Sequence, residues 1–215
     1  MSAKNKKAPK SKHAGNLTLL GGRLCLDFVN TVEWWGKEEP LEYLRTYHDL
    51  IAWSRHTHIL NYKEAKILSQ RADVCISKAD RVLNRGLKLR ENIYRLFSAI
   101  AQGHKPAAQT LMHFNKYLAA TMRSVRIFED RSGFRWDAAG DKNKLDWVLN
   151  PIIYSAADLL VSDELKKVKS CSNRLCGWLF LDSSRNQSRR WCDMNDCGNR
   201  AKAIRFYNKN KGLKL

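Results

Sequence analysis

The sequence predicts a mainly α-helical protein: an N-terminal helical domain with a small β-hairpin, followed by a small cysteine-rich domain. Apolar residues between about 41 and 125 recur with the three- and four-residue spacing of helices that bury one face. The composition turns basic and cysteine-rich near 162–169, and four of the six cysteines lie beyond that boundary. We therefore expect a disordered basic tail at 1–15, a helical domain at 16–165 and a cysteine-rich domain at 166–215.

The composition excludes several classes of protein. Hydrophobic residues make up 44% of the 215 residues, which is enough for a folded core. No stretch approaches about 20 uninterrupted apolar residues, so we expect neither a transmembrane helix nor a membrane partner. The basic N-terminal stretch has no apolar segment behind it, which argues against a secretory signal. Six cysteines without an export signal favour the reducing cytoplasm, where clustered cysteines more often hold a metal than form disulfides.

The first folded residues, 17–35, are dense in apolar side chains. A short strand or turn is expected at Gly21 and Gly22. An extended or helical piece follows over 24–32, a run too short for periodicity to decide between the two. Pro40 then interrupts the chain.

Helices are expected from residue 41 onward. Apolar spacing predicts the first over 41–55. Asn61 and Glu64 have the spacing of a capping box, which predicts the start of a second helix. A long helix over 79–102 follows, and Gly103 is placed to end it.

The rest of the helical domain is expected to contain a helix over 107–122, a β-hairpin over 125–137 and a helix over 143–161. Two short alternating runs flank Asp130–Gly133, the pattern of a hairpin. Pro151 lies inside the last helix, so we expect a kink or a break there.

The net charge of +18 is concentrated at the two ends of the chain. Residues 1–12 carry +5 and residues 166–215 carry +10. Such a localised basic excess indicates a polyanionic partner, most simply nucleic acid. The alternative is a soluble protein with basic ends and no specific partner.

Four cysteines near the C-terminus have the spacing of a metal site. They form a C-x4-C-x15-C-x4-C pattern, in which each short pair brings two thiolates together and the intervening loop joins the pairs. Structural zinc is the expected ion, because four thiolates leave no open position for water or substrate. The alternative is four free thiols. The expected ligands are Cys171, Cys176, Cys192 and Cys197.

The residues around these cysteines resemble the CGNR zinc-finger family, and the N-terminal part is similar to its usual partner, the ABATE domain. The resemblance covers about residues 17–210, and it implies a bacterial protein of a group regarded as stress-induced transcription regulators. The segments that carry it are Leu26–Thr31, Leu89–Phe97, Cys176–Phe180, Ser183–Asn186, Arg189–Cys192 and Cys197–Arg200.

The segment after Cys197 is expected to be a basic helix over 198–210 that contacts nucleic acid, with DNA favoured over RNA. Its apolar side is expected to pack on the metal-bound core, through Ala203, Ile204 and Tyr207. The loop at 183–191 adds cations and two amides that can pair with base edges, Asn186 and Gln187. The expected nucleic-acid contacts are Arg185, Arg189, Arg190, Arg200, Lys202, Arg205 and Lys209. The alternative is a solvated basic face.

Two polar residues inside an apolar run, Asp27 and Asn30, are candidates for a ligand pocket, although capping or turn roles are more common for such residues. Cys25 and Cys75 lie among apolar residues and are expected to be buried. No phosphate-binding loop, HExxH motif or nucleophile elbow is present, so we expect no enzyme activity.

The leading hypothesis is therefore a cytoplasmic transcription regulator in which a structural zinc finger binds DNA. The helical domain would sense a signal, contact a partner or form a homodimer. Three alternatives stay open: an RNA- or ribosome-associated factor, a protein-interaction module that binds no nucleic acid, and a small-molecule-binding enzyme centred on Asp27 and Asn30.

Overall fold

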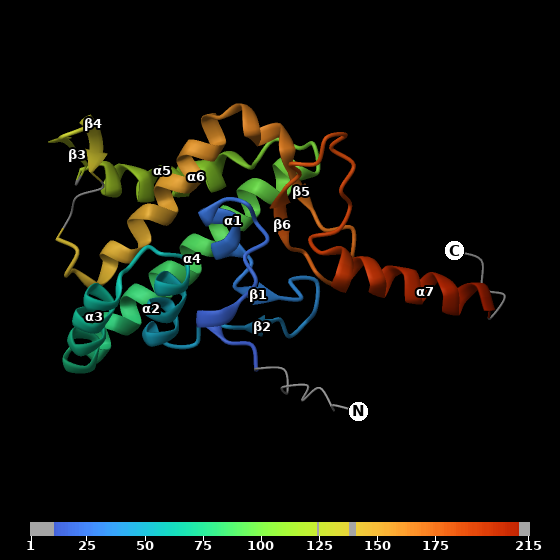
Figure 1. The fold of residues 1–215 in the computed structure, drawn as a ribbon, viewed down its shortest axis with the longest axis horizontal. Coiled ribbons are helices and arrows are strands. Elements are labelled where there is room, and N and C mark those ends of the chain that lie inside the picture. The colour runs from blue at the N-terminus through green and yellow to red at the C-terminus, as the bar shows by residue number, and fades with distance from the viewer. Residues whose placement is uncertain (1–10, 124, 138–140, 211–215) are drawn as a thin grey trace, which may run out of the picture.

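A computed structural model describes residues 11–123, 125–137 and 141–210, and it confirms the mainly α-helical class. The long helix α4 (Ile76–Ala101) runs through the middle of the molecule with the other N-terminal helices around it (Figure 1). Helix α7 (Asn199–Asn210) projects from the side that carries the last two strands. None of the helices in the described ranges is long and apolar enough to cross a membrane.

The other elements are further α-helices and, among the described residues, three two-stranded antiparallel sheets. The remaining helices are α1 (Leu24–Val29), α2 (Tyr47–His56), α3 (Tyr62–Val74), α5 (Ala108–Met122) and α6 (Asn150–Val161). The strands are β1 (Val32–Glu33), β2 (Leu41–Glu42), β3 (Arg126–Asp130), β4 (Gly133–Asp137), β5 (Val168–Ser170) and β6 (Leu179–Leu181).

The predicted disordered tail has a defined structure where the structure describes it, at residues 11–15. Its residues 1–10 lie outside the described residues. Residues 14–16 instead form a single 3-10 turn, in which Ala14 is only 1% exposed. Lys12 is also fixed, because its ammonium group pairs with Glu33 at 2.7 Å. A buried alanine and an ion pair to the body of the protein therefore hold part of this segment in place.

The helix predicted over 41–55 begins six residues later than expected. Residues 41 and 42 form strand β2, which pairs with β1. The helix then starts after Thr46, whose side chain accepts a hydrogen bond from the Asp49 backbone N–H while the Asp49 carboxylate accepts one from Thr46. A capping box thus sets the start of α2, and the apolar spacing did not reveal it.

Local sequence signals correctly placed several other boundaries. Asn61 caps α3 through the predicted exchange with Glu64, at 2.9 Å in both directions. Gly103 follows α4 with a φ of +76°, in the left-handed region that favours glycine. Pro151 marks a break: a 3-10 turn ends at Leu149, and the proline lies in the first turn of α6, where its missing N–H needs no partner.

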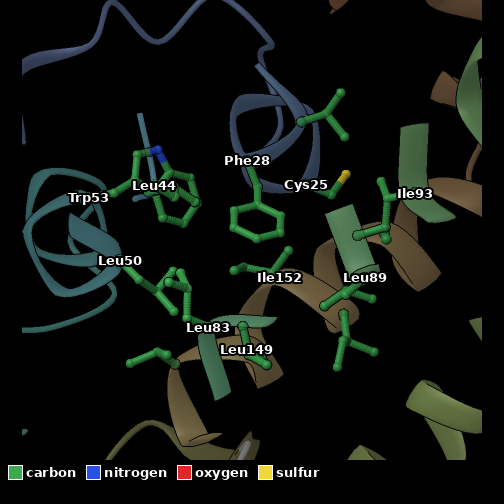
Figure 2. Close-up of a cluster of buried hydrophobic side chains, with 14 of the residues drawn as sticks. Cys25, Phe28, Leu44, Leu50, Trp53, Leu83, Leu89, Ile93, Leu149 and Ile152 are labelled. Carbon is green, nitrogen blue, oxygen red and sulfur yellow. The ribbon is translucent and has the colours of Figure 1, made fainter. Parts of the chain in front are cut away.

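The main hydrophobic core lies where α1, α2, α4 and α6 meet. Figure 2 shows Phe28 of α1 pointing between these helices toward Ile152 of α6 and Leu89 of α4. Its ring lies 5.2 Å from that of Trp53 on α2. Cys25 is buried in this core as predicted, whereas the prediction for Cys75 is wrong, because that residue lies exposed at the junction of α3 and α4.

Strand β6 forms a wall shared by two cores. Side chains alternate along a strand, so successive residues point to opposite faces. Leu179 and Leu181 belong to the main core, whereas Phe180 between them belongs to a second core around the four C-terminal cysteines. Burial of side chains of this size contributes about 1.5–3 kcal/mol each. The cysteine-rich segment, residues 166–210, is therefore packed into the helical part.

Candidate metal centre and nucleic-acid interface

The four predicted metal ligands converge in the cysteine-rich segment. Strand β5 ends directly before Cys171, the tight turn after Cys176 leads into β6, and Cys197 lies in the helical turn that precedes α7. All four side chains are buried, and their sulfur atoms all lie within 4.8 Å of one another. Backbone hydrogen bonds hold the pairs together, including one from the Ser172 N–H to the Arg190 carbonyl at 2.8 Å.

The spacing of the sulfurs fits a tetrahedral ion. Zinc–sulfur bonds of about 2.3 Å in a tetrahedron place the sulfurs about 3.8 Å apart. The Sγ atoms of Cys176 and Cys192 are 3.6 Å apart, and those of Cys192 and Cys197 are 3.7 Å apart. These separations are far longer than a disulfide bond. The donor set therefore forms a metal centre whose coordination shell the protein closes by itself.

The four thiols influence one another's ionisation. Hydrogen bonds from Cys176 and Cys192 hold the pKa of Cys171 well below its usual range, and the same contacts raise the pKa of the Cys176 and Cys192 thiols. A divalent cation removes this competition, because all four sulfurs can then bind it as thiolates. The Nδ2 group of Asn173 lies 3.7 Å from the Cys197 sulfur and can donate a weak hydrogen bond to it.

The segment around β1 supports the metal centre from the helical side. The Trp178 indole N–H donates to the Val32 carbonyl at 2.7 Å, and the Trp35 backbone N–H donates to the Cys176 carbonyl at 3.3 Å. Trp35 also stacks on Tyr94 of α4 with ring centroids 4.3 Å apart. Gly177 has a φ of +68°, and a Cβ there would lie 2.6 Å from that of Trp35. A glycine is therefore needed where the two parts touch.

Arg189, predicted to contact nucleic acid, makes its contacts in this structure within the cysteine-rich segment. Its guanidinium donates to the Trp191 carbonyl at 2.9 Å and to the Cys192 carbonyl, and it lies 4.4 Å above the Phe180 ring. Its backbone N–H donates to Asp182 at 2.9 Å. Hydrogen bonds from Lys169, Ser184 and Arg189 hold the pKa of the fully buried Asp182 well below its usual range. The contacts of Arg189 and Asp182 therefore hold the 183–191 loop in place.

Helix α7 does not pack on the metal-bound core as expected. No residue of this helix is buried, and Ile204 and Tyr207 are 53% and 55% exposed. The prediction that this side would be covered is therefore wrong, because the helix leaves the body of the protein after its first turn, as Figure 1 shows. The predicted basic residues of α7 are all exposed: Lys202, Arg205 and Lys209.

A groove of about 480 Å³ lies between α7 and two loops, Cys171–Cys176 and the 183–191 loop before Cys192, and we call it the α7 groove. Three arginines line it: Arg174 and Arg190 from these loops and Arg205 from the helix. Trp191 supplies an aromatic wall, and Arg190 lies 5.5 Å from its ring. The sequence did not identify Arg174 as a nucleic-acid contact, because a position between Cys171 and Cys176 equally suits an arginine that offsets thiolate charge. The lining residues are Ser172, Asn173, Arg174, Arg190, Trp191, Ala201, Ile204 and Arg205.

The two remaining predicted nucleic-acid contacts, Arg185 and Arg200, lie in different places. Arg185 is exposed on the 183–191 loop, outside the α7 groove lining. Arg200 pairs with Asp196 of its own segment at 2.8 Å, and its guanidinium lies 4.4 Å from the centre of the Trp34 ring in the helical part. Trp34 has a φ of +67° and is also contacted by Lys37, 4.5 Å from its ring. Arg200 thus joins α7 to the segment after β1.

The two candidate pocket residues bind main-chain groups. The Asp27 carboxylate accepts a hydrogen bond from the Gly21 N–H at 2.8 Å and so closes the turn before α1. The Asn30 side chain is buried and pairs with both backbone groups of Leu179 on β6: it donates to the carbonyl at 2.9 Å and accepts from the N–H at 3.0 Å. Asn30 therefore extends the sheet edge and joins the two parts of the chain.

Asp27→Asn is expected to stabilise the protein at neutral pH, because burial raises the pKa of Asp27 to about 6. The folded state binds this proton more tightly than the unfolded state, so the stabilisation from protonation is complete below about pH 4 and is lost as the pH rises through about 6. The variant's advantage in free energy of unfolding should grow by about 1 kcal/mol between pH 5.0 and 7.5 in urea titrations. An advantage that stays constant with pH would show that Asp27 ionisation is not its cause.

The helical part and the buried four-cysteine centre together define a metal-binding protein of the zinc-finger class. Two families match the chain: the CGNR zinc finger over residues 167–210, and ABATE, described as "Putative stress-induced transcription regulator", over residues 22–163. Because the ABATE match covers about two thirds of the chain, the protein belongs to this family and ends in a CGNR zinc finger. No match was found among curated proteins.

Proposed function

We propose that this protein is a stress-responsive transcription regulator of the cytoplasm that binds duplex DNA through the α7 groove and the exposed basic side of α7. The helical part supplies the platform and receives a signal. The role is binding rather than catalysis. Membership of a family described as transcription regulators supports this reading, as does the C-terminal CGNR zinc finger.

Zinc is the proposed metal. Cys171, Cys176, Cys192 and Cys197 would hold it as four thiolates, at the separations that tetrahedral zinc requires. Bound there, zinc would supply a cross-link that fixes the two loops lining the α7 groove and the turn that precedes α7. The loops then hold Arg174 and Arg190 in the lining of the groove, and these arginines bind and orient phosphate groups.

The distribution of charge around the metal centre is the observation on which the proposal depends. The α7 groove has three arginines and no acidic residue in its lining. A separate cavity of about 330 Å³ beside the same centre has an acidic excess instead, because Glu33, Asp193 and Asp196 line it with a single cation, Lys12. A phosphate backbone is attracted to the first surface and repelled by the second. The same segment therefore presents one side to DNA.

The test is duplex binding by a groove variant, Arg174→Ala with Arg205→Ala. For about five phosphate contacts, the logarithm of the association constant should fall against the logarithm of salt concentration with a slope of about −4 to −5. In the double variant the slope should become less negative by about two. The association constant should fall about tenfold or more for every DNA sequence. Fluorescence anisotropy with a labelled duplex of about 25 base pairs measures both quantities.

The matched control is Lys63→Ala with Lys66→Ala, which removes two exposed charges from α3. Both variants must retain the metal, measured by elemental analysis. Equal losses in the two variants would assign the effect to net charge and contradict the proposal. Preferential binding of a structured RNA would favour the RNA-associated alternative, and binding of neither nucleic acid would favour a protein-interaction module.

A further inference from the structure

A second basic groove lies between α4 and α5, apart from the metal centre. It has a volume of about 520 Å³, within the range of small-molecule sites. Helix α4 contributes residues 85, 88, 92 and 95 at helical spacing, and α5 contributes residues 113, 116 and 117. Arg90 and Tyr94, which face β2 and Trp35, lie on nearly the opposite side of α4. This α4–α5 groove is therefore separate from the proposed DNA-binding surface.

The charges in the α4–α5 groove are unbalanced. Four cations line it with a single carboxylate, Glu91, which pairs with Arg95 at 2.6 Å. Arg85 reaches Asp146 at 3.4 Å. Lys88 on α4 and Lys116 on α5 form no ion pair with any residue in the ranges that the structure describes. Like charges gathered around one groove repel one another, and a bound anion relieves that repulsion.

The floor of the groove contains an unused polar atom. Asn92 is only 8% exposed, and its Nδ2 group donates to the Thr110 carbonyl at 3.1 Å. Its Oδ1 atom accepts no hydrogen bond from the described part of the chain. Buried polar atoms without a partner are rare in folded proteins, and each calls for an explanation. Tyr117 also lines the groove, with its ring 5.8 Å from the Arg85 guanidinium.

We propose that the α4–α5 groove binds a small phosphorylated metabolite that also has hydroxyl groups. Lys88 and Lys116 attract the phosphate from both walls as point charges, and Arg85 and Arg95 offer planar pairs of donors. A ligand hydroxyl donates to Asn92 Oδ1 after a small rotation of that side chain. The site gives the helical part a chemical input that is independent of the nucleic-acid surface.

The test is isothermal titration calorimetry of the full chain with fructose 1,6-bisphosphate, ribose 5-phosphate and pyrophosphate at low salt. At least one of the two sugar phosphates should bind one per chain with a Kd below about 1 mM, and more tightly than pyrophosphate. Lys88→Ala with Lys116→Ala should weaken that binding at least tenfold. The control pair Lys63→Ala with Lys66→Ala should leave it unchanged.

Three results overturn the proposal. The first is that neither sugar phosphate binds one per chain, or that pyrophosphate binds more tightly than both. The second is an equal loss in the control pair, which would mean that net charge alone attracts the anions. The third is anion binding that Lys88→Ala with Lys116→Ala leaves unaffected. Loss of duplex-DNA binding in the same variant would then make the groove part of a nucleic-acid surface. The calorimetric titration with the anions needs no nucleic acid. Its outcome is therefore independent of whether the protein binds duplex DNA.

Discussion

Cys197→Ser is expected to abolish stoichiometric metal binding and to unfold the cysteine-rich segment. Cys197 supplies one of the four sulfurs and lies in the helical turn that precedes α7, so its loss opens the coordination shell and releases that helix. Structural zinc sites of this kind contribute about 10–16 kcal/mol of apparent binding free energy at neutral pH, which a segment of this size cannot replace with its own core. This is the largest effect that we expect from a single substitution.

Elemental analysis and circular dichroism measure the two consequences. The zinc content should fall from one per chain to near zero, while most of the helical signal persists because α1–α6 keep their own core. The melting temperature should nevertheless fall, since Leu179 and Leu181 of the released segment belong to that core. Cys75→Ser is the matched control, because this cysteine is exposed and far from the centre in the sequence. Full zinc content in Cys197→Ser would contradict the assignment of the ligands.

Asn30→Ala is expected to destabilise the whole protein by about 2–4 kcal/mol. The substitution leaves the N–H and the carbonyl of Leu179 buried without partners, and each such group costs about 1–3 kcal/mol. For a chain of this size the melting temperature should fall by about 5–15 °C. Differential scanning calorimetry measures the change.

Asn30→Asp separates the two hydrogen bonds, because it keeps the acceptor for the Leu179 N–H but removes the donor to the carbonyl. It also places a charge in a buried position and should be no more stable than wild type. The control is Asn84→Ala, an exposed position on α4. A melting temperature within about 1 °C of wild type in Asn30→Ala would show that water replaces the lost partner groups and that the junction is looser than the geometry implies.

Local signals in the sequence predicted much of the fold. The capping box of Asn61 with Glu64, the glycine after α4 and the hairpin between α5 and α6 all depend on neighbours within a few residues. Predictions failed where distant residues decide. Apolar spacing extended α2 back to residue 41, but pairing with β1 makes those residues a strand. Nothing in the sequence of α7 indicates the direction in which the helix leaves the body of the protein, so its apolar side was wrongly predicted to be covered.

The metal ligands could be predicted because spacing along the chain determines which thiols converge. The contacts of the basic residues could not be predicted in this way, because an arginine in the sequence is the same whether its guanidinium faces solvent or a carbonyl. Arg189 and Arg200 find partners inside the protein, through Phe180 and Trp34, whereas Arg174 lines the α7 groove. Contacts of this kind join segments separated by up to about 165 residues, and no local pattern encodes them.

The two-sided strand β6 makes the zinc finger inseparable from its neighbour. A chain cut at the junction between the two family matches would leave the helical remnant without Leu179 and Leu181 and would bare an apolar surface prone to aggregation. The excised finger would likewise lose Leu20 and Trp35, which pack against its core from the other side. Exchange of zinc fingers between relatives therefore requires transfer of all the residues that pack on β6, with both faces of the strand matched to the new host.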